Sequence, residues 1–448
     1  MKAIVGFAAN AAPPEAARAA AARAVADTVG VALAGAVEPA AVIVQRVIDR
    51  GGPCVVFGTD RTAGATNAAL ANGTAAHALD FDDMCFVSLA HPSAPLVTAA
   101  WAAAEVANAT GRDLLDAYVV GFEIEGRLGR AMNPRHYRRG WHCTSTLGTV
   151  GSAAACARLF GLDESRTAHA LAIAASSASG LKENFGTMVK PLHAGLAARS
   201  AVLAAELARA GMTASAAAID GPQGFLTAFD SESPTLDDVA GDLGSRWEIL
   251  DTGITVKLYP SCAATHPILD ALIDLQAREH FDASQVDAID VGVDPVTPTV
   301  LIYDRPVSGL EGKFSLPFCA AAALVYGAVG IETFDDAQMR DPRIASLQSR
   351  VTMRVDETLG GSAPPLTQAR VTVTMKDGRV VTAHANGARG YPERPPTEDQ
   401  LKTKFKSCAA RVMSSVQAHE AWTALRGIER VKVADVSAAL AHVRASTP

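Results

Sequence analysis

The sequence predicts a mainly α protein with an inserted α+β domain, so that a large all-helical bundle domain is joined to a smaller α+β domain. Three observations support this prediction. Alanine-rich segments with helical spacing fill the chain up to residue 267, segments of alternating apolar and polar residues follow, and helical spacing returns after residue 400. We therefore expect residues 1–267 and 400–448 to form the helical domain, and residues 268–399 to form the smaller α+β domain.

Proline and glycine mark the ends of the predicted helices in the first part of the chain. Residues 14–35 begin at Pro14 and end at Gly35, which is the usual asymmetry of helix ends. Comparable helices are expected over residues 66–79, 94–107, 113–131, 144–160, 165–179 and 193–210. Alanine at this density favours helices and lets them approach closely, as in a compact bundle.

Alternation with a period of two predicts the strands of the smaller domain. It runs over residues 286–293, and again over residues 369–375 and 379–383 on either side of the turn Lys376-Asp377-Gly378. A polar, proline-rich run at residues 390–399 ends this domain, and helices are expected over residues 400–425 and 436–443.

Composition and charge exclude several classes of function. The formal net charge is −7 and no block of lysine and arginine occurs, which argues against binding to nucleic acid or to an anionic membrane surface. Seven scattered cysteines without a C-x-x-C pair indicate neither a disulfide framework nor a zinc ribbon. No stretch approaches the roughly 20 apolar residues that span a bilayer. We expect a cytoplasmic protein.

Four short segments concentrate histidine, lysine and aspartate at turns between the helices. They are HALDFDD with a later HPS (residues 77–93), GWHCTSTLG (residues 140–148), KPLHAG (residues 190–195) and KLYPSCAATHP (residues 257–267). Ionisable groups gathered at turns of an otherwise alanine-rich protein point to an active site.

The acidic segment allows more than one interpretation. We expect Asp80 and Asp83 to share one face, and we expect Asp82 to cap the helix that follows. Three carboxylates near His77 and His91 could hold a divalent metal, but no compact ligand spacing such as H-x-x-x-H is present. We therefore expect no metal.

His91 and His142 stand in similar places, each just before a predicted helix start. Ser93 can cap the helix near residue 94, and threonine and serine open the helix after His142. A histidine beside the amides of a helix start is a plausible proton-transfer group near a bound anion, whereas the alternative is a core histidine bonded to the backbone.

The two lysines and the groups near Lys257 form the rest of the candidate site. Lys190 and Lys257 lie between apolar neighbours, so their side chains either snorkel to the surface or meet substrate carboxylates as compact positive charges. Cys262 lacks an evident base, which makes a nucleophilic role less favourable than substrate binding. His266 is either a third site histidine or a cap for the helix that it begins.

These same segments resemble the MmgE/PrpD family, which includes 2-methylcitrate dehydratase, cis-aconitate decarboxylase and iminodisuccinate epimerase. The resemblance rests on HALDFDD with HPS, GWH before a small-residue helix, KPLHAG, and K-x-Y-P-x-C with a later T-H-P. It covers nearly the whole chain. It implies a helical domain built from both ends of the chain, an inserted α+β domain and a homodimer.

The resemblance also implies site roles for Asp80, His91, His142, Lys190 and Lys257. Hypothesis: the lysines hold the carboxylates of a small di- or tricarboxylic acid, His91 and His142 transfer protons, and Asp80 orients one imidazole. No organic cofactor is expected, because neither a G-x-G-x-x-G turn nor a P-loop occurs.

Three residues distinguish the chain from the animal cis-aconitate decarboxylases. Met84, Cys262 and Phe318 stand where threonine, histidine and tyrosine are expected, and the loop before His91 is a residue longer. Dehydration, decarboxylation and epimerisation therefore stay open. A lyase is the first expectation, an epimerase of an iminodisuccinate-type substrate is the alternative, and a non-catalytic polycarboxylate-binding protein is the third.

Overall fold

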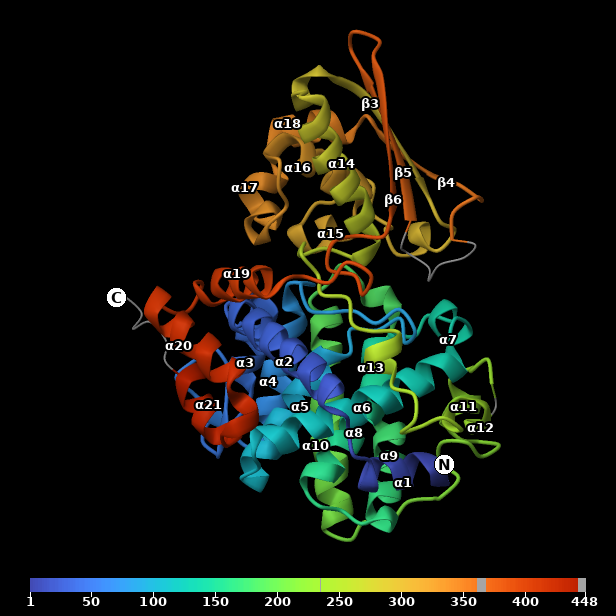
Figure 1. Cartoon of the computed structure of the whole chain (residues 1–448), viewed down its shortest axis with the longest axis vertical. Coiled ribbons are helices and arrows are strands. Elements are labelled where there is room, and N and C mark those ends of the chain that lie inside the picture. The colour runs from blue at the N-terminus through green and yellow to red at the C-terminus, as the bar shows by residue number, and fades with distance from the viewer. Residues whose placement is uncertain (234, 361–367, 442–448) are drawn as a thin grey trace. The chain divides into compact units, whose positions relative to one another are not determined.

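The computed structural model describes residues 1–233, 235–360 and 368–441 and divides the chain into two compact units (Figure 1). Unit 1 comprises Met1–Asn184, Met188–Ile254 and Thr397–Pro448, and unit 2 comprises Phe185–Thr187 and Thr255–Pro396. The divisions after Ile254 and Pro396 differ from the expected ones after residues 267 and 399. The segment that follows Ile254 already packs within unit 2, since Val256 N–H donates to the Gly390 carbonyl at 2.8 Å.

Unit 1 is a helical bundle in which α8 lies at the centre, against α5, α6, α9 and α10. Its interior is built largely from alanine and other small side chains, which lets the helices pack closely. The N-terminal helices are α1 (Lys2–Asn10), α2 (Glu15–Gly35), α3 (Pro39–Val47), α4 (Ala65–Ala78), α5 (Ser93–Ala107), α6 (Gly111–Met132), α8 (Cys143–Leu159), α9 (Glu164–Ser177) and α10 (Val189–Arg209). Shorter helices are α7 (Arg135–Arg138), α11 (Phe225–Ala228), α12 (Asp237–Ala240) and α13 (Glu248–Asp251), and β1 (Cys54–Val55) pairs with β2 (Thr62–Ala63).

Helices α4 and α10 approach each other backbone to backbone at two glycines. A Cβ atom on Gly195 would lie 2.3 Å from Thr74 Oγ1 and 2.4 Å from the Leu70 carbonyl oxygen, and one on Gly73 would lie 2.9 Å from Gly195 Cα. Only glycine fits such a contact. The close packing brings the last turn of α4 beside the first turn of α10.

The C-terminal helices complete unit 1. The segment expected as one helix over residues 400–425 is divided into α19 (Glu398–Ala409) and α20 (Ser415–Arg426), because Ser414 and Gln417 form a capping box that starts a new helix. Helix α21 (Val433–Leu440) replaces the expected helix over residues 436–443, of which 442 and 443 lie outside the described residues. Helix α19 packs on α2, and α21 contacts α5.

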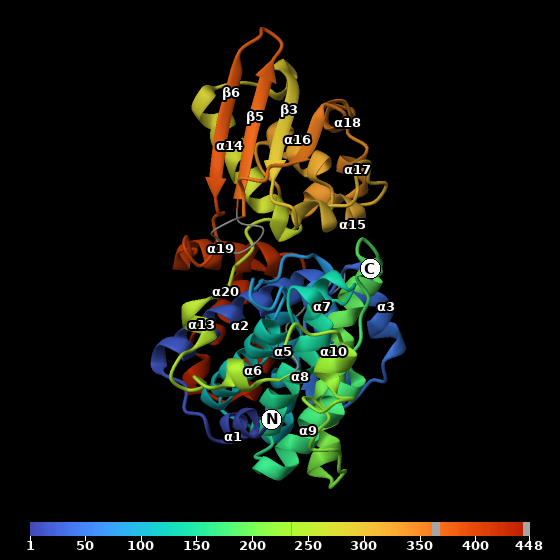
Figure 2. The same cartoon turned by 90° about the vertical axis from the view of Figure 1, so that its right-hand side faces the viewer.

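Unit 2 contains a four-stranded sheet with helices on one face (Figures 1 and 2). The strand order is β4 (Val351–Val355), β3 (Val286–Val293), β5 (Gln368–Met375) and β6 (Val380–Asn386). Strands β3 and β4 are parallel, whereas β5 is antiparallel to β3 and to β6, with the expected hairpin at residues 376–378. Helix α14 (His266–Glu279) packs on β5 and β6, and α16 (Leu316–Tyr326) contacts β4. The remaining helices are α15 (Gly309–Gly312), α17 (Asp336–Met339) and α18 (Pro342–Gln348).

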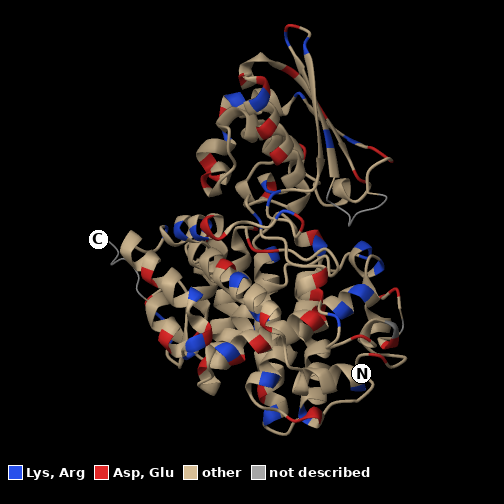
Figure 3. Ribbon diagram, in the orientation of Figure 1, with Lys and Arg blue, Asp and Glu red and all other residues tan. Residues whose placement is uncertain are grey.

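Charged residues of both signs are interspersed along both units (Figure 3). Among the described helices, no single one is both long and apolar enough to cross a membrane; α2 and α3 meet that requirement only as a pair, which is bent by 85° at the break between them.

Candidate active site

Three of the four chemistry-bearing segments meet inside unit 1. His77 lies in the last turn of α4, Asp80, Asp82 and His91 lie in the loop that leads to α5, His142 immediately precedes α8, and Lys190 lies in the first turn of α10. All of these residues except His91 are at most 4% exposed. A buried cluster of this many ionisable groups is rare in a protein interior and marks a functional site.

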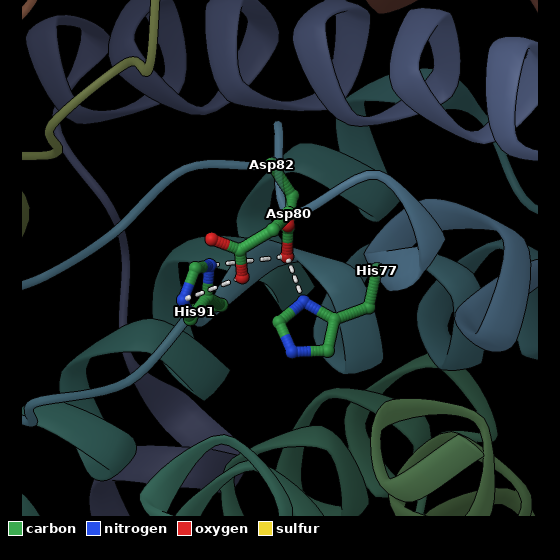
Figure 4. Close-up of side chains that lie close together, drawn as sticks. All are labelled: His77, Asp80, Asp82 and His91. Carbon is green, nitrogen blue, oxygen red and sulfur yellow. Dashed lines mark hydrogen bonds and ion pairs between the residues drawn. The ribbon is translucent and has the colours of Figure 1, made fainter. Parts of the chain in front are cut away.

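The loop after α4 is shaped so that its acidic side chains return to the helix end (Figure 4). Asp80 adopts the left-handed conformation with φ of 52°, which aspartate tolerates better than most residues. Cys85 and Ala90 then pair as an isolated antiparallel bridge and turn the chain back. The backbone N–H of His91 donates to Thr144 Oγ1 at 3.0 Å, which fixes His91 beside the start of α8.

Hydrogen bonds join four of these residues in a continuous chain. His77 Nδ1 lies 2.8 Å from Asp82 Oδ2, and His77 Nε2 lies 2.8 Å from Lys190 Nζ. Lys190 also donates to Asp80 Oδ1. The two aspartates are thus connected through an imidazole and an ammonium group.

His91 faces both aspartates and is the most accessible imidazole of the cluster. Its Nε2 lies 3.8 Å from Asp80 Oδ1 and its Nδ1 lies 3.4 Å from Asp82 Oδ2, while its side chain is 12% exposed. The His77 ring lies between the other two, 4.6 Å from the centroid of His91 and 5.6 Å from that of His142. An accessible imidazole between two carboxylates is suited to carrying a proton.

His142 is paired with a histidine from α10. The Nδ1 atoms of His142 and His193 lie 3.0 Å apart, so one ring donates and the other accepts. Burial, with Lys190 nearby, lowers the pKa of His193 to about 4 and holds the pKa of His142 well below its usual value. Both rings are therefore neutral at neutral pH.

The pKa values of His77 and Asp82 are both lowered, but for different reasons. Burial, reinforced by the charge of Lys190, lowers the pKa of His77 despite the attraction of Asp82. Burial alone would raise the pKa of Asp82, but the nearby imidazoles His77 and His91 outweigh it and hold that pKa below its usual range. Asp82 is thus an anion beside a neutral His77.

Three expectations about the loop are wrong. Asp82 does not cap the following helix but bonds His77, and it is Asp83 that accepts from the Ser93 backbone N–H at 3.2 Å and from the Ser93 hydroxyl. Asp80 and Asp82, rather than Asp80 and Asp83, therefore reach the same cluster. Ser93 is the first residue of α5 and its side chain makes no capping bond. A loop of irregular backbone does not keep the helical spacing on which those expectations depended.

Neither lysine snorkels to the surface. Lys190 is 4% exposed in unit 1 and Lys257 is fully buried in unit 2. Cys262 is half-buried, and His266 begins α14 without capping it, since His266 Nε2 lies 3.3 Å from the Ser261 carbonyl oxygen. Lys257, Cys262 and His266 all belong to unit 2, and their part in the site stays a prediction.

The motif that carries Lys257 is held by an ion pair of unit 2 between the buried Asp270 and the half-buried Arg389. Tyr259 O–H donates to Asp270 Oδ1 at 2.6 Å, and the Arg389 guanidinium donates to the same carboxylate and to Tyr259. This arrangement fixes the loop of residues 257–260 on α14.

Four side chains of unit 1 have the composition of a metal site. His77, Asp80, Asp82 and His91 offer ligand atoms within 4.8 Å of one another (Figure 4). However, the Lys190 ammonium already bonds both His77 Nε2 and Asp80, and so supplies positive charge where a cation would compete with it. The donor set therefore fits a site that uses lysine in place of a metal.

Sequence reasoning missed three members of the cluster: His77, Asp82 and His193. Both histidines stood inside the motifs, but His77 was considered only as a metal ligand and His193 had no assigned role, and Asp82 was assigned to a cap. On a continuous helix, side chains five residues apart, such as His77 and Asp82, do not face each other. The two side chains make contact only because the chain leaves the helix at Leu79 and turns at Asp80.

Comparison with known proteins agrees with these motifs. Residues 2–236 match the family model of the MmgE/PrpD N-terminal domain, and residues 259–430 match that of the MmgE/PrpD C-terminal domain. The chain is 31% identical over 360 residues to cis-aconitate decarboxylase of Homo sapiens, covering 78% of this chain and 73% of that protein. It is 30% identical over 415 residues to the cis-aconitate decarboxylase-like protein oryM of Aspergillus oryzae, covering 88% and 85%, respectively. It is 28% identical over 403 residues to cis-aconitate decarboxylase of Aspergillus terreus, covering 85% and 82%.

Proposed function

Since the chain belongs to the MmgE/PrpD family, we propose that it is a cofactor-independent lyase acting beside a carboxylate of a small tricarboxylic acid, with decarboxylation of cis-aconitate as the first reaction to test. The observation that carries this proposal is the cluster of four histidines, two aspartates and Lys190 in unit 1, in which every residue except His91 is buried. The names of its relatives supply the candidate substrate.

Decarboxylation of cis-aconitate needs a place for an electron pair and a source for one proton. When the bond between the CH₂ carbon and its carboxylate breaks, carbon dioxide leaves and the electron pair moves through the adjacent double bond. It reaches the carbon beside another carboxylate, which then takes a proton to give an unsaturated dicarboxylate. The enzyme must stabilise the negative charge on that carbon and its carboxylate and deliver the proton.

The residues of unit 1 suit these two tasks. The Lys190 ammonium is buried, so its charge acts in a medium of low dielectric and stabilises an enolate-like intermediate more strongly than it would in water. His91 is the better candidate for the proton donor, because it is the most accessible imidazole of the cluster and lies against Asp80 and Asp82, whereas His142 is buried and held neutral. Lys257, Cys262 and His266 are the proposed substrate-binding residues of unit 2.

The experiment that tests the proposal is proton NMR of the purified, EDTA-treated protein in D₂O. The panel comprises citrate, 2-methylcitrate, cis-aconitate, malate and iminodisuccinate. We expect loss of cis-aconitate with deuterium in the product, and unchanged turnover after EDTA treatment. A new alkene from citrate or 2-methylcitrate would instead establish a dehydratase. Exchange with inverted configuration would establish an epimerase, and silence throughout would contradict a lyase for these acids.

A further inference from the structure

His77 lies between an anion and a cation and has both ring nitrogens engaged. Nδ1 is 2.8 Å from Asp82 Oδ2 and Nε2 is 2.8 Å from Lys190 Nζ, and the residue is 1% exposed. A histidine that transfers protons to a substrate needs one nitrogen free to face that substrate. His77 is instead held at both ends by protein groups.

The partners dictate the tautomer. A lysine ammonium carries only donors, so the bond between Lys190 and His77 requires an acceptor at Nε2. The ring proton must then reside on Nδ1, from which it donates to the Asp82 carboxylate, an acceptor only. Only one position of the ring proton therefore satisfies both hydrogen bonds: Asp82 accepts from His77 Nδ1–H, and His77 Nε2 accepts from Lys190.

We propose that His77 is a positioning residue, a neutral imidazole in the Nδ1–H form that holds the Lys190 ammonium in the site and is itself oriented by Asp82. Lys190 has rotatable bonds along its whole stem, and the two acceptors His77 Nε2 and Asp80 Oδ1 fix its direction. Through its contact with His91 at 3.4 Å, Asp82 orients the proposed proton donor as well as His77. The kinetic part of this proposal rests on the proposed function.

The groups that face His77 act in opposite directions: the Asp82 carboxylate favours a charged ring, whereas burial and the positive charges of Lys190 and His91 favour a neutral one, and burial has the largest effect. Asp80 also offers a carboxylate oxygen within 4.8 Å of the ring. Asp82 comes from the same loop, His91 from the approach to α5, His142 from the start of α8 and Lys190 from α10. Burial and the Lys190 charge act against a second proton on His77, and its pKa is correspondingly lowered.

The first test is spectroscopic and needs no substrate. The protein is labelled with ¹⁵N-histidine, and long-range ¹H–¹⁵N correlations at neutral pH report which ring nitrogens carry protons. The signal that disappears in both His77→Gln and His77→Asn belongs to His77. We expect the Nδ1–H tautomer with one proton on the ring. An Nε2–H tautomer or a doubly protonated ring would overturn the proposal.

The second test separates the two hydrogen bonds of the ring. A glutamine at residue 77 places an amide oxygen near the position of Nε2 and can still accept from Lys190, whereas an asparagine can donate to Asp82 but is too short to reach Lys190. We expect His77→Gln to keep KM within a few-fold, and His77→Asn to raise KM about tenfold or more, which is the effect expected when a hydrogen bond to a charged group is lost. His419→Gln, on the exposed side of α20, is the matched control.

Equal effects of the glutamine and asparagine variants would contradict the positioning role, since a purely structural histidine would not distinguish them. The two proposals can fail separately. A protein that leaves cis-aconitate unchanged but shows the Nδ1–H tautomer would refute the proposed reaction and keep the assignment of His77. Turnover of cis-aconitate by a protein whose His77 is in the Nε2–H form would support the proposed reaction and refute the assignment of His77.

Discussion

At the residue scale, His91 and His142 are the groups on which proton transfer is predicted to depend. A positioned acid or base contributes roughly 10²- to 10⁴-fold to a rate, so we expect His91→Ala and His142→Ala to lower kcat by about that factor. Circular dichroism and the melting temperature check that each variant remains folded. If both variants kept wild-type kcat on the substrate found by NMR, neither histidine would be the proton-transfer group.

Asp83 is a second residue whose ionisation is predicted to have a measurable effect. Burial raises its pKa to about 7 from the ordinary 3.8, although the Ser93 hydrogen bonds oppose that shift. A carboxyl whose pKa is higher in the folded than in the unfolded state stabilises the fold below the unfolded pKa. That contribution is lost as pH rises from about 4 through 7, and amounts to about 4 kcal/mol at most for a shift of this size.

The asparagine variant isolates this effect because its side chain stays neutral. We expect the free energy of unfolding of Asp83→Asn, minus that of wild type, to increase steadily between pH 4 and pH 8, because only the wild type loses stability over that range. Urea unfolding at several pH values measures it. Asp60→Asn, at an exposed position, controls for the loss of one carboxylate. A difference between Asp83→Asn and wild type that does not change with pH would show that Asp83 titrates normally.

At the element scale, the contact between α4 and α10 is predicted to set the distance from His77 to Lys190. A Cβ atom at residue 195 would collide with Thr74 Oγ1 and the Leu70 carbonyl oxygen, which are already joined by a hydrogen bond of 2.8 Å. The helices must separate, and overpacking of this kind costs about 1–3 kcal/mol. We therefore expect Gly195→Ala to lower the melting temperature and to raise KM, as measured by calorimetry and steady-state kinetics.

Gly6→Ala provides the comparison, because the nearest atom to a Cβ there is Glu164 Oε1 at 3.8 Å. In that open helical position alanine should stabilise by up to about 1 kcal/mol through helix propensity alone. Gly195→Ala with a melting temperature at or above that of Gly6→Ala would mean that the helices have room to move.

Helices and strands with strong local signals were predictable, whereas the site loop was not. Pro14 and Gly35 mark the ends of α2, and the expected strand over Val286–Val293 coincides with β3, because terminal residues and alternation act within a few residues. His77, Asp82 and His193 escaped because their contacts depend on the turn at Asp80 and on the packing of α4 against α10. Strand β4 also escaped, because its parallel pairing with β3 joins segments far apart in the sequence.

At the scale of the whole molecule, the C-terminal segment of unit 1 supports the site loop through Lys404. This lysine, on α19, lies 2.8 Å from Asp27 Oδ1 on α2 and donates to the Phe81 carbonyl oxygen at 2.9 Å. Its side chain is 4% exposed. Phe81 stands between Asp80 and Asp82 in the sequence. One buried ammonium therefore links α19 and α2 to the loop that carries both site aspartates.

Removal of that ammonium should therefore affect stability and the site together. Lys404→Met leaves the Asp27 carboxylate and the Phe81 carbonyl buried without their donor, and breaking a buried pair in this way costs about 3–5 kcal/mol. Lys406→Met, on the exposed side of α19, should change little. Urea unfolding measures both variants.

A double variant distinguishes the pairing with Asp27 from the support of the loop. Asp27→Asn in the Lys404→Met background removes the unpaired charge, so part of the lost stability should return. The Phe81 carbonyl would still lack its donor, and the turn that aims Asp80 and Asp82 at His77 and Lys190 would still be loosened. We therefore expect stability to recover while kcat/KM on the substrate found by NMR stays low. Recovery of both quantities together would mean that Lys404 acts on the fold alone and that the site loop holds its shape without it.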